Sequence, residues 1–158
     1  MLTMLAFPQS IQAAGRAQVA SLVQPVQVES AWARATVAGQ KSTGAFMRLT
    51  ARSATSLVGV STTAAGITEL HEMKMNGDVM TMRELPALDL PAGESVELQS
   101  GGRHIMLMDL NRALLPGATI PLVLKFRDAA GVESTLSLNV PVSKAAPAAE
   151  AGAPVNKP

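Results

Sequence analysis

One stretch of the chain decides its fold class: LHEMKMNGDVMTM, residues 70–82. Its centre, Asn76-Gly77, is a strong short-range signal for a β-hairpin, and the residues on either side alternate as strand residues do. Taken as a two-residue loop, this pair sets His71 opposite Met82 on the partner strand. We therefore predict two antiparallel strands that carry imidazole and thioether side chains on one face.

The rest of the central region repeats this pattern of short strands and turns. Turn signals such as Ala38-Gly39, Gly101-Gly102 and Pro116-Gly117 separate the apolar runs. About eight or nine short strands at this spacing predict an all-β sandwich or barrel, and only residues 111–115 could form a helical turn. The predicted strands cover residues 26–36, 43–50, 56–62, 67–75, 79–85, 95–98, 104–110, 119–126 and 132–140.

The composition limits the class of function. The 158 residues carry a net charge of +1 with scattered basic residues, which argues against a nucleic-acid partner. No run of 18 apolar residues occurs, so no membrane-spanning helix is predicted. The absence of cysteine excludes a disulfide scaffold, a thiolate zinc site and a blue-copper centre.

The two ends of the chain differ in composition from the middle. Residues 1–25 are interpreted as a leader and linker, because a short apolar run followed by Ala13-Ala14-Gly15 resembles the end of a secretory signal peptide. Residues 143–158 are rich in Ala, Pro and Lys, and we expect them to be disordered. One domain at 26–142 and a periplasmic or otherwise extracytoplasmic location follow, with a disordered cytosolic leader as the alternative.

Both histidines of the chain open a His-x-Met step, at His71 and at His104. A period of two places His104, Met106 and Met108 on one face of their strand, with Ile105 and Leu107 on the other. Imidazole and thioether groups without thiolate form a soft ligand set that suits copper(I) best among abundant metals. The two strand faces could converge on a site of two nitrogens and two sulfurs.

The other residues near these two His-x-Met steps are methionines, cations and carboxylates. Four further methionines are candidates for an apolar shell around the site or for an entry path, and ordinary packing is an equal alternative for them: Met73, Met75, Met80 and Met108. Three cations are expected on the opposite, solvated face: Lys74, Arg83 and Arg103. Three carboxylates are interpreted as surface charges: Glu69, Glu72 and Glu84. No nucleophile and base combination is evident, so an enzyme is not predicted.

The ligand spacing resembles the H-x10-M-x21-H-x-M signature of the periplasmic PCuAC (DUF461) copper(I) chaperones. It is matched here by His71, Met82, His104 and Met106. The flanking residues at 31–36, 44–47, 90–93 and 101–107 also resemble that family, and the resemblance covers about residues 26–142. It implies a cupredoxin-like Greek-key β-sandwich that binds one copper(I) ion per monomer through these four residues.

The resemblance also implies partners. Members of the family are implicated in delivering copper to the cytochrome c oxidase subunit that holds the CuA centre, alongside a thioredoxin-like copper chaperone. The C-terminal segment has no His and no Met, so an additional copper(II) site is not expected.

Three other interpretations stay open. The first is a copper buffering or resistance protein with the same site. The second is a metal-free Ig-like interaction module. The third is a zinc or copper(II) site formed by His71, His104 and a nearby glutamate.

Overall fold

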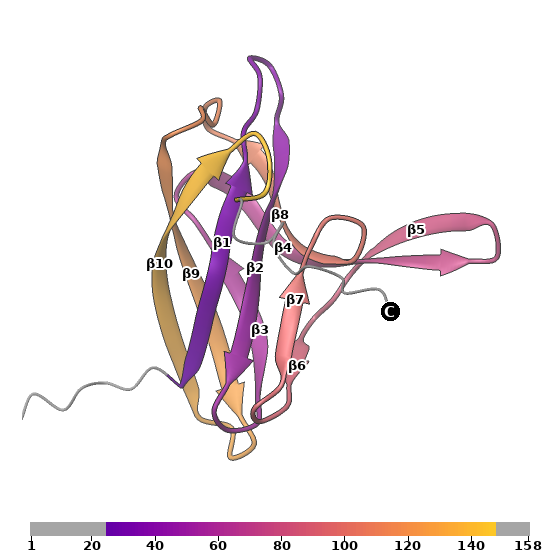
Figure 1. Cartoon of the computed structure of the whole chain (residues 1–158), viewed down its shortest axis with the longest axis vertical. Helices are drawn as coiled ribbons and strands as arrows, with labels where there is room; N and C mark the ends of the chain where they lie inside the picture. Colours follow the sequence, from indigo (N-terminus) through magenta and orange to yellow (C-terminus); the bar gives the residue numbers. More distant parts are fainter. Residues whose placement is uncertain (1–24, 148–158) are drawn as a thin grey trace, which may run out of the picture.

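The structure, a computed structural model, describes residues 25–147 and consists of β-strands joined by turns and loops (Figure 1). Within that range no helix is long and apolar enough to cross a membrane. The strands are β1 (Val26–Arg34), β2 (Ser42–Ala51), β3 (Thr55–Ser61), β4 (Ala65–Asn76), β5 (Val79–Glu84), β6 (Leu88–Leu90), β7 (Ser95–Leu98), β8 (Arg103–Leu110), β9 (Thr119–Asp128) and β10 (Glu133–Ser143).

The strands form two sheets. The first sheet has the order β5-β4-β8-β2-β1, and β7 pairs with the part of β2 that β8 does not cover. The second sheet has the order β10-β9-β3-β6. The two sheets are joined by a short parallel pairing of β1 with β10, in which Ala33 lies opposite Val142 and Arg34 opposite Ser143.

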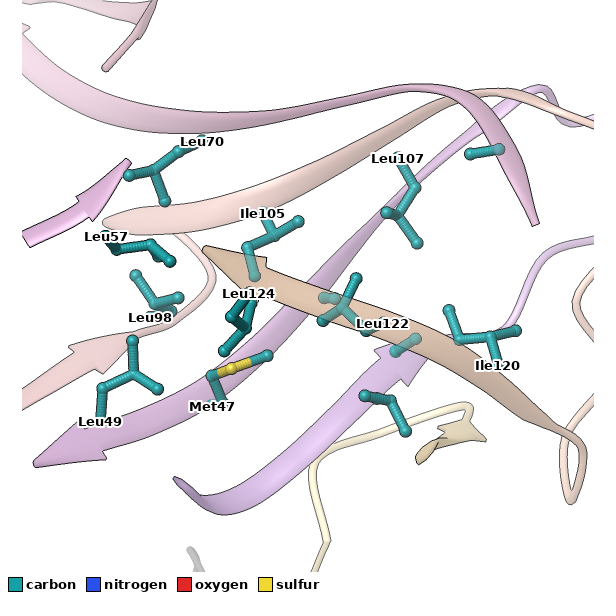
Figure 2. Packing of buried hydrophobic residues seen from close by; sticks show 14 of the residues in the cluster. Met47, Leu49, Leu57, Leu70, Leu98, Ile105, Leu107, Ile120, Leu122 and Leu124 are labelled. Atoms are coloured by element: carbon teal, nitrogen blue, oxygen red, sulfur yellow. The ribbon is translucent and has the colours of Figure 1, made fainter. Parts of the chain in front are cut away.

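The core fills the space between the two sheets. Alternate residues of β9 point inward, and Ile120, Leu122, Leu124 and Phe126 are all buried. Figure 2 shows three of them packed against side chains from the first sheet, such as Ile105. Full burial of a leucine or isoleucine side chain contributes about 1.5–3 kcal/mol, so this alternation is what holds the layers together.

A bulge in β1 changes which face its side chains occupy. The register with β2 shifts between Glu29 and Trp32, and Ser30 within the shift has a φ of 51°. Because the shift inverts the alternation, Trp32 lies opposite Phe46 on the outer face of the first sheet, whereas Val26 stays in the core. The bulge thereby brings an aromatic pair to the face that carries the histidines.

All nine predicted strand segments form strands in the structure. A tenth strand, β6, was not predicted, and residues 111–115, the one segment that could have formed a helical turn, form bends and a loop. Of the predicted leader at 1–25 only Pro25 is described, and of the predicted tail at 143–158 only residues 143–147 are described, where Ser143 ends β10.

Candidate metal centre

The two histidines are brought together by the pairing of β4 with β8. His71 lies directly opposite His104 in the antiparallel register, and their ring centroids are 6.1 Å apart in an edge-on arrangement. Their exposed fractions are only 9% and 8%. The two imidazoles therefore form a buried pair on the outer face of the first sheet, since their chain neighbours Leu70 and Ile105 point into the core.

The ring of His71 is oriented by a carboxylate. Its Nε2 lies 2.8 Å from Oε2 of Glu69, and a carboxylate only accepts, so Nε2–H is the donor. The other ring nitrogen, Nδ1, is buried and has no hydrogen-bond partner among the described residues. A buried unpaired polar atom is costly, and a histidine whose second nitrogen is held by a carboxylate is the usual arrangement of a metal ligand. His71 thus fits a metal ligand that binds through Nδ1.

His104 is held by the backbone. Its Nδ1 lies 3.2 Å from the carbonyl oxygen of Gly102, so Nδ1–H is the donor and Nε2 keeps its lone pair. The short turn at Gly101-Gly102 places this carbonyl two residues before the ring, where Gly101 has a φ of 82°. One lone pair is consequently available on each imidazole.

A hollow of about 300 Å³ lies beside His104. Its walls include Met106 from β8, Met82 from β5 and Met73 from β4. Three of the four predicted ligands therefore border one space. The fourth, His71, is not among the residues that line it, and its ring lies beside that of His104. The remaining wall residues are Arg34, Gln40, Thr43, Gly44, Phe46, Ser100 and Gly101.

The predicted register of the hairpin is wrong by two residues. His71 lies opposite Glu84, and Met82 lies opposite Met73. The loop consists of Gly77 and Asp78, with Asn76 paired to Val79, because Gly77 takes the first central position with a φ of 64°. A glycine with positive φ there is typical of a type II′ turn, whereas the prediction assumed a type I′ turn centred on Asn76-Gly77. A shift of two keeps every side chain on its predicted face, so Met82 still faces the hollow.

The four other methionines occupy different places. Met73 is half-buried and lines the hollow. Met75 and Met80 lie opposite each other near the tip of the hairpin and are exposed by 55% and 51%. Met108 is half-buried, lies opposite Ile67 and Ser42, and is not part of the hollow wall.

The charged residues are divided between the two faces of β4. Lys74, Arg83 and Arg103 are on the face opposite the histidines, as predicted. There Arg83 and Arg103 donate to the carboxylate of Glu72, at 2.9 and 3.3 Å. The hydrogen bond from Arg83, together with the two positive charges, holds the pKa of the Glu72 carboxyl below its ordinary value.

Glu69 is the site residue that the sequence reasoning missed. It was interpreted as a surface charge, yet it binds the ring of His71. The two-residue spacing from His71 was the signal that could have revealed it, because the strand period puts both side chains on one face. Among the described residues no group of three or more His, Asp or Glu side chains is arranged to hold a metal ion.

An aromatic pair lies beside the hollow, and one of its rings, that of Phe46, lines it. The rings of Trp32 and Phe46 are 4.9 Å apart, and Phe46 lies 6.4 Å from His104. The guanidinium of Arg34 lies 5.5 Å from the centre of the Phe46 ring. Gly44 leaves room for this ring, since a Cβ there would be 2.8 Å from its Cζ atom.

Comparisons with known proteins show which family the chain belongs to. The family model described as "Putative lipoprotein LpqE-like" matches residues 26–142. A protein from Leifsonia xyli subsp. xyli (strain CTCB07), described as "Putative lipoprotein Lxx21020", is 35% identical over 118 residues, which are 74% of this chain and 69% of the relative.

Two solved structures have the same fold. The copper(I)-bound solution structure of DR1885 from Deinococcus radiodurans has a TM-score of 0.60 and 32% identity, covering 80% of this chain and 83% of that chain. The copper-bound PCuAC domain from PmoF2 has a TM-score of 0.61 and 21% identity, covering 77% of this chain and 94% of that chain. The β-sandwich prediction is confirmed. The chain belongs to the LpqE-like family, and the predicted PCuAC (DUF461) relationship is confirmed.

Proposed function

We propose that this protein is a copper(I) carrier that holds one ion per chain with His71, Met82, His104 and Met106. The observation that carries the proposal is the buried Nδ1 of His71, which lacks a partner while Glu69 fixes the other nitrogen of the ring. The copper(I)-bound relative and the copper-bound PCuAC domain support the choice of metal. Copper is the cargo here, and the protein is proposed to act as a monomer without enzymatic activity.

The ligand set suits an ion that must be held and then released. Thioether ligands are neutral and bind without losing a proton, and the two imidazoles are already oriented by Glu69 and by the carbonyl of Gly102. Met82 is 49% exposed on the hairpin, whereas Met106 is half-buried on β8. A thiolate of an acceptor would therefore displace Met82 first, and the stronger, charged sulfur donor would favour the transfer.

The proposed partners and location are drawn from the family relationship. The acceptor would be the cytochrome c oxidase subunit with the CuA centre, and a thioredoxin-like copper chaperone would act beside this protein. An extracytoplasmic location is supported by the description of the family and of the Leifsonia relative as lipoproteins. A larger hollow of about 580 Å³ shares Arg34, Phe46 and Ser100 with the hollow beside His104, so a partner protein has room to approach there.

The test is an anaerobic copper(I) titration of the purified chain against a chromogenic chelator. One tight equivalent is expected in the parent and its loss in Met106→Leu, with Met108→Leu as the matched control on the same strand face. Equal binding by the parent and Met106→Leu would reject the site. Transfer of the ion to an apo CuA domain, followed by its absorption spectrum, separates delivery from buffering, because a buffer would retain its copper.

A further inference from the structure

We infer that the tip of the β4–β5 hairpin is a second soft-metal site, formed by the thioethers of Met75 and Met80. This site is separate from the proposed His–Met centre and does not require it. The two residues lie directly opposite each other, in a register that puts both side chains on one face. Directly opposed side chains have Cβ atoms about 4.5–5.5 Å apart, so two flexible thioethers there can reach one ion.

The exposure of these methionines is not explained by packing. Figure 1 shows the hairpin projecting from the two layers, and all six residues of β5 are exposed. Met75 and Met80 are exposed by more than half. Methionine usually fills gaps in a core, and there is no core at the tip for it to fill.

The composition of this face points to a metal and not to a protein partner. Its positions on the hairpin are His71, Met73 and Met75 on β4, and Met80, Met82 and Glu84 on β5. Every one is a histidine, a methionine or a glutamate, and the branched aliphatic residue of the tip, Val79, belongs to the other face. The residues that dominate protein interfaces are tryptophan, tyrosine and arginine, and this face of the hairpin has none of them, whereas four thioethers on one face are the donor set that selects copper(I).

The side-chain hydrogen bonds that hold the two strands of the hairpin together lie on its opposite face. There the carboxylate of Glu72 binds Arg83 and Arg103, and the hydroxyl of Thr81 donates to the carbonyl oxygen of Lys74 at 3.2 Å. The methionine face is thus free of hydrogen bonds that hold the strands in register. It forms a ladder in which the Met75–Met80 pair is followed by the Met73–Met82 pair at the hollow.

The experiment uses the full chain labelled with ¹³C in the methionine methyl groups. Silver(I) is the probe, because it binds thioethers as copper(I) does and does not change oxidation state during the titration. In the parent we expect one equivalent to shift Met82 and Met106, and a second, weaker equivalent to shift Met75 and Met80. In Met106→Leu the shifts of Met75 and Met80 should persist, and in Met75→Leu/Met80→Leu the second equivalent should disappear while the first remains.

Three outcomes would overturn the inference. Met75 and Met80 could stay unshifted after Met82 and Met106 saturate, or they could lose their response in Met106→Leu. They could also shift no more than Met108 does, which would mean that silver binds any single thioether. If Met82 and Met106 fail to respond while Met75 and Met80 saturate, the second site stands and the proposed carrier site falls.

Discussion

His71 and His104 lie directly opposite each other on β4 and β8, and their rings contact edge-on with centroids 6.1 Å apart. Each ring is held by a different anchor, the carboxylate of Glu69 for one and the carbonyl of Gly102 for the other. Since both anchors accept an N–H, a free lone pair is left on both rings at once. The nitrogen half of the proposed site is therefore preorganised, and copper(I) binding would not have to order it.

Removing the anchor of His71 should weaken binding without unfolding the protein. In Glu69→Ala the ring loses the group that fixes its tautomer and orientation, so copper(I) affinity should fall by about 10–100-fold. The measurement is a competition titration with a copper(I) chelator. Glu84→Ala is the control, because Glu84 lies opposite His71 on β5 and is exposed. Equal losses in the two variants would reject the anchoring role of Glu69.

Replacing a thioether by a hydrocarbon of similar volume should separate binding from stability. Met106→Leu should abolish tight copper(I) binding while changing the free energy of unfolding by less than about 1.5 kcal/mol. Chelator competition and urea denaturation measure the two effects. Met108→Leu, two residues along the same face and outside the hollow wall, should leave affinity unchanged. A large loss of stability in Met106→Leu would mean that this side chain is needed for packing.

Gly44 should tolerate no side chain, for a steric reason. A Cβ there would approach Cζ of Phe46 to 2.8 Å, and that ring is already confined by Trp32 and His104. Gly44→Ala should cost about 1–3 kcal/mol of stability, measured as a shift in the urea midpoint, and should also reduce copper(I) affinity by displacing His104. In the control Gly59→Ala, the nearest atom is Cβ of Lys125 at 3.5 Å, an ordinary contact. Equal midpoints for the two variants would contradict the prediction.

Acid should weaken the pairing of β9 with β10. Hydrogen bonds from Arg127 and Lys125 hold the pKa of the Glu133 carboxyl below its ordinary value of 4.5. These contacts therefore stabilise the fold above about pH 4.5 and lose their contribution as the pH falls through the lower, folded-state pKa. The denaturation midpoint of Glu133→Gln should lie below that of the parent at pH 7, and the difference should vanish in acid. Glu94→Gln, at an exposed glutamate with no ion pair among the described residues, should show no such difference at any pH.

The sequence predicted those parts of the fold that depend on alternation alone. The nine strands, and the face occupied by each methionine of residues 70–82 and 104–108, follow from the two-residue period. β6 was missed because its three residues lie between Pro86 and Pro91, and so short a segment shows no periodicity. The register of the hairpin was missed because Asn-Gly and Gly-Asp both favour tight turns, and the choice between them depends on the φ of Gly77.

The site was predictable to a similar degree. The spacing of the histidines and methionines indicated which side chains share a face, but the direct opposition of His71 and His104 depends on the order of strands in the sheet. No local pattern encodes that β4 lies next to β8. The inversion at the β1 bulge, which brings Trp32 to the outer face, is equally a property of the assembled sheet.

The short parallel pairing of β1 with β10 has a consequence for how the chain folds. It joins Ala33 to Val142, more than 100 residues apart, and it is the seam that connects the two sheets. Closing so long a loop is entropically slow, and the partner strand β10 follows the other nine described strands along the chain. The sandwich accordingly cannot close along this seam until β10 has left the ribosome and reached β1, so the two sheets can be joined only after every other described strand has been made.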